Sequence, residues 1–438
     1  MSNDFCLAPW THTYISPQGE RRLCCASREP AQNFKQYIDT DANGMGTGEF
    51  KGLTLEEHWN SEHVRNIRKT WLRGEVPDAC QVCDKKLLNT SVYKDYFGHL
   101  FSHLREQAIE TTNADGFTTM QPISWDYRYS NVCNFKCRMC GDMLSSAWES
   151  EVRKHELANM DNPKNHWMLP HNRKAIRDFV QGTVVPEFEA AVENKTIREI
   201  YWVGGEPLLY DEHWRFMRRI VELGYADQVR VRYNTNLSVV KDKEGTLYDL
   251  LNNFADWEIC ASLDGTGAIG EYIRTGLDYS SWYNNFSLGV AAQKHRRQCR
   301  IDFTLTLPGM FDIAGIVALS KEFDSQLLSK VIFSFSPNII LSPLALPRDI
   351  LHPWLDELIE YCNLNMDHNI HSLRDVLVQL KTRPTFQEQW PDEWKQGLWD
   401  GKRHLLKLES IRKDATLTMD KILSARPEVL AWWNSIKV

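Results

Sequence analysis

Residues 131–140 read Asn-Val-Cys-Asn-Phe-Lys-Cys-Arg-Met-Cys and hold three cysteines, Cys133, Cys137 and Cys140, at the spacing C-x3-C-x2-C. Thiolates this close along a chain can ligate three irons of a cubane cluster, because soft sulfur ligands select iron–sulfur clusters or zinc. No fourth cysteine lies nearby, so one iron of such a cluster would stay open to a small molecule. A structural zinc site would normally need a fourth protein ligand.

The length and composition set the class of protein. The chain has 438 residues, which suits two or three domains. It is 42% hydrophobic and 25% charged, and it has no apolar run near the ~18 residues of a membrane helix. The net charge of −7 argues against broad binding to nucleic acid. The first residues, MSNDFCLAPW, do not have the pattern of a signal peptide, so a cytoplasmic location without a membrane partner is expected.

The eleven cysteines are unevenly distributed. An odd number without an export signal, with C-x-x-C spacing, is more typical of metal ligands than of disulfides. Three scattered cysteines, Cys260, Cys299 and Cys362, are expected to fill apolar sites. Five others gather in the first fifth of the chain: Cys6, Cys24, Cys25, Cys80 and Cys83.

The N-terminal region, residues 1–95, is rich in loops around these cysteines. One helix is expected from Thr54 to Arg73, ending at Gly74 ahead of Pro77. A unit this small is hard to stabilise with an apolar core alone, so a metal site there would contribute to its folding. Residues 96–119 are expected to form a helical connector.

From residue 120 to 346 strand-like and helical segments alternate, which predicts an α/β fold with a parallel sheet. Six strands would form an open, partial (β/α)6 barrel like part of a TIM barrel, with its chemistry at the carboxyl ends of the strands. Residues 347–438 are expected to be a helical C-terminal cap rich in tryptophan, more typical of core packing than of a substrate platform. The expected strands are Ile123–Tyr127, Glu199–Val203, Val229–Tyr233, Trp257–Ser262, Arg300–Leu305 and Lys330–Phe335.

Polar and glycine-containing motifs follow these strands. Gly204-Gly205-Glu206-Pro207 ends the second strand, where two glycines would let a ligand approach the backbone and a carboxylate could receive an ammonium group. Each motif alone could also be an ordinary turn or cap. Further polar residues follow the later strands: Asn234 and Asn236 after the third, Ser262 and Asp264 at the end of the fourth, and Arg274 shortly beyond. Asparagine and serine side chains suit hydroxyl groups of a ligand, and arginine suits a carboxylate.

Taken together, these motifs resemble those of the radical SAM (S-adenosylmethionine) superfamily, whose signature is C-x3-C-x-aromatic-C. Met139 occupies the usually aromatic position, and Asn134 is also typical. The resemblance implies a SAM-binding [4Fe–4S] cluster on Cys133, Cys137 and Cys140. It also implies that the G-G-E-P motif contacts the amino group of SAM, while elements like those of SPASM and twitch enzymes line its ribose and carboxylate. The SAM-binding residues implied are Gly204, Gly205, Glu206, Pro207, Asn234, Asn236, Ser262, Asp264 and Arg274.

The N-terminal cysteines resemble the C-x(9–15)-G-x4-C element of SPASM and twitch domains, since Cys6, Gly19 and Cys24 have this spacing. Such domains hold auxiliary iron–sulfur clusters, which implies a second [4Fe–4S] cluster on Cys6, Cys24, Cys80 and Cys83. Cys25 would be spare or could replace Cys24, and a zinc ion on the same thiolates is the alternative. These domains usually follow the barrel, whereas here the cysteines precede it.

The resemblance implies an enzyme that reductively cleaves SAM to a 5′-deoxyadenosyl radical for C–H abstraction. It favours a peptide or protein substrate, with a sugar or another small molecule as the alternative. A flavodoxin or ferredoxin would be the reductant. A non-catalytic iron–sulfur or zinc protein, acting in redox relay or as a scaffold, is the rival interpretation; retention of the SAM motifs argues against it.

Overall fold

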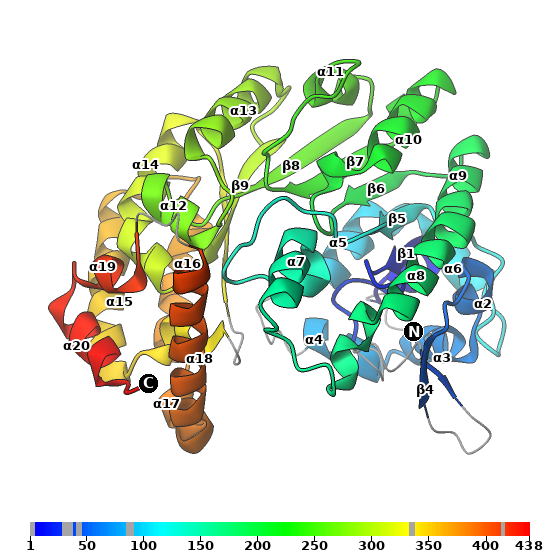
Figure 1. The fold of residues 1–438 in the computed structure, drawn as a ribbon. Coiled ribbons are helices and arrows are strands. Elements are labelled where there is room, and N and C mark those ends of the chain that lie inside the picture. The colour runs from blue at the N-terminus through cyan, green and yellow to red at the C-terminus, as the bar shows by residue number, and fades with distance from the viewer. Residues whose placement is uncertain (1–4, 29–37, 41–45, 85–91, 333–337, 413–416) are drawn as a thin grey trace. The chain divides into compact units, whose positions relative to one another are not determined.

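The computed structural model describes residues 5–28, 38–40, 46–84, 92–332, 338–412 and 417–438 (Figure 1). The chain forms two compact units. The first unit comprises Met1–Cys133, Asp142–Tyr233 and Asp249–Trp257. The second comprises Asn134–Gly141, Asn234–Tyr248 and Glu258–Val438. The division into N-terminal domain, connector, barrel and cap stays a prediction.

Parallel strands form the centre of the first unit. β5 (Ser124–Tyr127) pairs with β6 (Glu199–Trp202), which pairs with β7 (Arg230–Thr235). The N-terminal region adds β1 (His12–Ile15), parallel to β5, and β2 (Arg21–Arg22), antiparallel to β1. The cysteine-rich region thus extends the sheet of the strands that follow it.

Side chains alternate between the two faces of these strands. Trp125 and Tyr127 of β5 both contact Phe188 of α9 (Val185–Glu193). Trp202 of β6 donates from Nε1 to the sulfur of Met217 in α10 (Asp211–Glu222). Helices therefore cover the aromatic face of β5 and β6, and polar residues such as Ser124 lie on the opposite face. The other helices of this unit are α1 (Ala8–Thr11), α2 (Leu55–Trp59), α3 (Glu62–Leu72), α4 (Gln81–Asp84), α5 (Val92–Leu100), α6 (Arg105–Glu110), α7 (Ser146–Lys154) and α8 (Pro170–Phe179).

The helix expected from Thr54 to Arg73 is two helices, so that prediction was wrong in its middle. The break falls between α2 and α3. The hydroxyl oxygen of Ser61 accepts from the backbone N–H of Val64 and caps α3. Serine and asparagine compete with helical hydrogen bonding in this way, and they favour a new start over a continuous helix.

The second unit holds the remaining parallel strands. β8 (Asp256–Ser262) pairs with β9 (Cys299–Leu305), which pairs with β10 (Leu327–Val331). β10 begins earlier than predicted, because Leu327 is buried; residues 333–335 of the predicted strand lie outside the described residues. Short helices accompany these strands: α11 (Leu247–Leu251, shared by both units), α12 (Gly267–Ile273), α13 (Tyr279–Ala292) and α14 (Ile313–Glu322). The α/β class and five of the predicted strands are confirmed, whereas the sixth shares only Lys330 and Val331 with β10.

The C-terminal region is helical, as predicted. Most of its tryptophans are core residues: Trp354 and Trp433 are buried, whereas Trp390 is exposed. Lys402 is buried beside Trp433, and its Nζ donates to the carbonyl oxygen of that residue. Among the helices that the structure describes, none has the length and apolarity needed to cross a membrane. The C-terminal helices are α15 (Arg348–Leu364), α16 (His371–Thr382), α17 (Phe386–Gln389), α18 (Pro391–Ile411), α19 (Met419–Leu423) and α20 (Pro427–Ser435).

Candidate functional site

The loop that carries Cys133 follows β5 and is held by the start of α7. The backbone N–H of Cys133 donates to Ser146 Oγ at 3.2 Å. The backbone N–H of Ser146 in turn donates to the carbonyl oxygen of Asn131 at 2.7 Å. The Asn131 amide donates to Glu149 Oε2 at 3.0 Å. The backbone before the first cysteine is therefore fixed by several hydrogen bonds from one helix.

The G-G-E-P motif contacts the same loop. The backbone N–H of Glu206 donates to the carbonyl oxygen of Val132 at 2.7 Å. A Cβ on Gly205 would lie 2.2 Å from that oxygen, so the loop can approach only because residue 205 lacks a side chain. Gly204 has a φ of +132°, a backbone conformation that favours glycine. Gly205 therefore admits the cysteine loop itself, a role that sequence reasoning missed.

Glu206 is fully buried, and its side chain caps the short helix that follows. Its Oε1 accepts from the backbone N–H of Leu208 at 3.2 Å, at the start of the 3-10 helix Pro207–Leu209. Nearby, the Tyr210 hydroxyl accepts from the Gly205 N–H at 3.0 Å and donates to the carbonyl oxygen of Ser130 at 2.7 Å. The motif is thus fixed in place beside the cysteine loop, with a carboxylate that a bound ammonium group could share.

In the second unit, the loop that carries Cys137 and Cys140 is held by the segment after α12. The backbone N–H of Lys136 donates to the Thr275 carbonyl oxygen at 2.7 Å, and that of Arg138 to the Ile273 carbonyl oxygen at 2.8 Å. The backbone N–H of Cys140 donates to the Cys137 carbonyl oxygen at 3.0 Å. The R-x-G element that begins at Arg274 therefore also supports the cysteine loop.

Arg274 and Asp264 form a buried ion pair beside Cys137. Arg274 Nε lies 2.6 Å from Asp264 Oδ2, and the guanidinium also reaches the sulfur of Cys137 at 4.0 Å. Burial raises the pKa of Asp264, while the pairing with Arg274 opposes this shift. Burial likewise raises the pKa of Cys137, against the opposing charge of Arg274. The guanidinium thus has two protein partners, where the sequence suggested a role toward a ligand carboxylate.

The remaining predicted strand-end residues join two polar groups in the second unit. The Asn236 amide donates to Asn134 Oδ1 at 3.0 Å, which ties that strand end to the cysteine loop. The Asn234 amide donates to Asp302 Oδ2 at 2.7 Å, and Lys330 Nζ donates to the same oxygen at 2.7 Å.

Ser262 is half-buried at the end of β8, opposite Asp302 in the register with β9. Sequence reasoning missed Asp302 and Lys330. Alternation of polar and apolar residues along β9 could have indicated Asp302.

The N-terminal cysteines gather in one core of the first unit. Cys6, Cys24 and Cys80 are buried together with Trp10 and Phe97 in a single apolar cluster. Burial raises the pKa of Cys6 to about 12 and that of Cys24 well above its ordinary value. Cys6, Cys25 and Cys80 all act electrostatically on Cys24.

Cys83, the fourth predicted ligand, lies in α4, and its charge acts on Cys6. Thiols are the donor type that an iron–sulfur cluster uses. Within the described residues, no three cysteine, histidine or carboxylate side chains are close enough to share one metal ion.

Cys25 faces a different environment from Cys24. Its thiol interacts with the hydroxyl of Tyr93, and Asp126 and Arg128 of the β5 region are its charged neighbours. Cys24, by contrast, belongs to the buried cluster with Cys6 and Cys80. The two adjacent thiols therefore differ in their surroundings, and Cys24 as the ligand stays a prediction.

A polar network near the N-terminal strand was also missed from the sequence. His12 Nδ1 lies 2.7 Å from Ser124 Oγ, and the Tyr96 hydroxyl donates to Glu199 Oε1 at 2.6 Å. Ser124 also donates to Glu199. Burial lowers the pKa of His12 to about 4, so this imidazole is neutral at neutral pH. The network ties α5 to the polar face of β1, β5 and β6.

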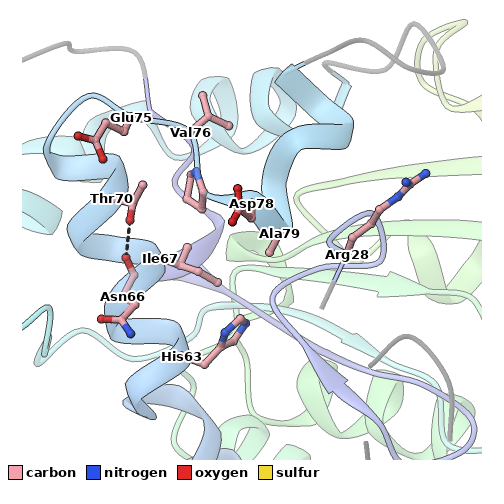
Figure 2. A pocket seen from close by; sticks show the side chains of 10 residues that line it. Arg28, His63, Asn66, Ile67, Thr70, Glu75, Val76, Asp78 and Ala79 are labelled. Atoms are coloured by element: carbon pink, nitrogen blue, oxygen red, sulfur yellow. Dashed lines mark hydrogen bonds between the residues drawn. The ribbon is translucent and has the colours of Figure 1, made fainter. Parts of the chain in front are cut away.

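A pocket of about 550 Å³ lies beside the N-terminal cysteines. Figure 2 shows side chains of α3, such as His63, on one side, with Asp78 and Ala79 on another. Asp78 and Ala79 directly precede Cys80, and Arg28 is anchored to them through a hydrogen bond from its backbone N–H to the Ala79 carbonyl oxygen. The pocket therefore adjoins the auxiliary cysteines, but its lining mixes acidic and basic groups and favours no one ligand class.

Comparison with known families agrees with this geometry. The family model described as "Radical SAM superfamily" matches residues 127–267, which include the three loop cysteines and the G-G-E-P motif. Residues 127–267 thus form a radical SAM domain. The SPASM model, described as "Iron-sulfur cluster-binding domain", matches residues 6–84. An auxiliary iron–sulfur domain that precedes the radical SAM domain is thus confirmed, and iron–sulfur is favoured over zinc.

Comparison with individual proteins adds three solved structures. No curated protein matches the chain. SuiB of Streptococcus suis bound to S-adenosylmethionine matches with 13% identity and a TM-score of 0.37, over 72% of this chain. SuiB bound to precursor peptide SuiA (12%, TM-score 0.36) and SuiB alone (12%, TM-score 0.37) match similarly. The match covers 65% of the SuiB chain in each case.

Proposed function

We propose that the chain is a radical SAM enzyme that modifies a peptide or protein. The observation that supports this most directly is the hydrogen bond between Glu206 and Val132, because it joins the G-G-E-P motif to the cysteine loop within the matched family domain. Three thiols on one short loop fit a cluster with one open iron. When bound, that cluster supplies the electron that splits SAM into methionine and a 5′-deoxyadenosyl radical, which removes a hydrogen atom from a C–H bond.

The protein's own residues would bind and orient the reactants. Cys133, Cys137 and Cys140 would hold the cluster, and Glu206 would accept hydrogen bonds from the ammonium group of SAM. Asn236 and Ser262 would contact its hydroxyl groups. Arg274 would fix the sulfur of Cys137 and, by moving off Asp264, could receive a carboxylate. The work of these groups is positioning and the exclusion of water.

The auxiliary cluster would be held by Cys6, Cys24, Cys80 and Cys83. A cluster with four protein ligands has no open iron, so its role would be electron transfer to or from the substrate radical. The chain is proposed to act in the cytoplasm, where reduced thiols persist, with a flavodoxin or ferredoxin as reductant. A peptide or protein is proposed as substrate by resemblance to SPASM and twitch enzymes, ahead of a sugar or other small molecule.

Anaerobic reconstitution with iron and sulfide tests the proposal. The loaded protein should contain about eight irons per chain, and dithionite with SAM should release 5′-deoxyadenosine. The variant with Cys133, Cys137 and Cys140 all changed to alanine should keep about four irons per chain. It should form no 5′-deoxyadenosine. If the loaded native protein is reduced but forms no 5′-deoxyadenosine, the chain is a non-catalytic iron–sulfur protein.

A further inference from the structure

A basic pocket of about 450 Å³ lies in the first unit, between α7, α8 and the loop before Cys133. Its cations are Arg153, Arg173, Lys174 and Arg177, and none of the described residues that line it is acidic. The whole chain carries a net charge of −7, so this face is a local exception. Such a concentration of one sign of charge attracts a partner of the opposite sign.

The cations of the basic pocket remain accessible at the surface. Arg153 and Arg173 share one carboxylate, that of Glu149, at 2.8 and 3.0 Å. Their side chains are 37% and 49% exposed, whereas that of Glu149 is 3% exposed, so two guanidinium groups lie over one buried carboxylate. Arg177 is exposed and forms no side-chain hydrogen bond or ion pair with the part of the chain that the structure describes. Lys174 pairs with the exposed Asp178.

The basic pocket adjoins the radical SAM cysteine loop. Val132 lines the pocket and is bonded directly to Cys133. Val132 is 39% exposed, and Leu144, in the segment hydrogen-bonded to Asn131, is 38% exposed. Exposed apolar side chains with charges around them are typical of surfaces that dock another protein. One exposed apolar side chain and four cations thus line a pocket beside Cys133.

The pocket opens on the helix-bearing side of β5. Tyr129 lines it and contacts Phe188 of α9, as Trp125 and Tyr127 do. The polar side chains of Ser124 and Asp126 alternate onto the opposite face. A molecule bound in the basic pocket would therefore be separated by β5 from the face that carries Ser124 and Asp126.

We propose that the basic pocket, with Val132 and Leu144, docks an acidic one-electron carrier protein, whose electron enters the radical SAM cluster from the Cys133 side. This rests on the proposed function. In each encounter the carrier loses one electron and the cluster gains it, and no atom is transferred. A protein partner fits better than a small anion, because the cations are spread over an exposed surface that includes apolar residues.

Binding of a reduced flavodoxin to the reconstituted protein tests the proposal. Arg177→Gln should weaken the affinity about threefold at low ionic strength, and Lys174→Gln/Arg177→Gln about tenfold. Salt should abolish these differences, since exposed charges are screened. Lys195→Gln is the matched control, because it also removes one exposed cation. Lys195 lies just before the first residue of β6 and does not line the basic pocket. The rate of cluster reduction by flavodoxin should fall in parallel, while reduction by dithionite stays unchanged.

Two outcomes would overturn the docking surface. One is an equal affinity for flavodoxin in Arg177→Gln and Lys195→Gln. The other is retained flavodoxin affinity with lost binding of a labelled polyglutamate peptide, which would assign the surface to an anionic substrate. If the native protein fails to cleave SAM with dithionite, the proposed enzymatic function is refuted. The flavodoxin affinities of the variants would still test the proposed docking surface.

Discussion

The backbone N–H of Glu206 donates a 2.7 Å hydrogen bond to the carbonyl oxygen of Val132, the residue before Cys133. Two motifs more than 60 residues apart in the sequence thus share one hydrogen bond. The position of Cys133 therefore depends on the conformation of the G-G-E-P motif. A substitution in the G-G-E-P motif should therefore lower the iron content of the radical SAM cluster even where all three cysteines are retained.

Gly205→Ala should disrupt the radical SAM cluster without removing a ligand. The added Cβ would lie 2.2 Å from the Val132 oxygen, and that backbone must shift. We expect destabilisation of about 1–3 kcal/mol and a loss of iron from this cluster, because the Cys133 loop is displaced. Iron per chain after reconstitution measures the effect. Gly182→Ala is the control, since its added Cβ would meet nothing within 4 Å; equal iron contents in the two variants would contradict the prediction.

Arg274→Gln should be strongly destabilising, because it leaves the carboxylate of Asp264 buried without its partner. We expect a loss of about 3–5 kcal/mol in the free energy of unfolding. The double variant Arg274→Gln/Asp264→Asn should recover much of this, since it removes the orphaned charge. Denaturant unfolding of the native protein, Arg274→Gln, Asp264→Asn and the double variant completes the double-mutant cycle. A double variant no more stable than Arg274→Gln would show that the ion pair is not what Arg274 contributes.

His12 should make stability depend on pH. Its pKa is lowered to about 4 in the folded protein by burial, against about 6.5 in an unfolded chain. The unfolded state therefore binds more protons between these values, and stability is lost as the pH falls from about 6.5 toward 4. The maximum loss from this group is about 3 kcal/mol. His12→Gln should remove this part of the pH dependence, as unfolding curves at pH 7.5 and 5.5 would show; equal pH dependence in both proteins would exclude His12 as the cause.

The strands and the cysteine motifs could be predicted from the sequence because their signals are local. Alternating apolar segments placed β5 to β9 within a residue or two, and cysteine spacing indicated the regions that the radical SAM and SPASM models match. What the sequence did not reveal depends on long-range packing. β1 has only four residues and pairs with β5 more than 100 residues later. Gly205 is needed because of its approach to Val132, and Asn234 bonds to Asp302 on β9, which pairs in turn with Lys330 on β10.

Cys24 and Cys25 offer the sharpest test of the auxiliary site, because adjacent residues face different surroundings. Cys24 lies in the buried cluster with Cys6 and Cys80, whereas Cys25 interacts with Tyr93. In the background that lacks Cys133, Cys137 and Cys140, Cys24→Ala should reduce the iron content from about four per chain to near zero. Cys25→Ala should retain about four irons, because a four-ligand cluster does not need it. Iron and sulfide assays with the absorbance of the cluster distinguish the two variants. Retention of iron in Cys24→Ala and its loss in Cys25→Ala would reverse the assignment.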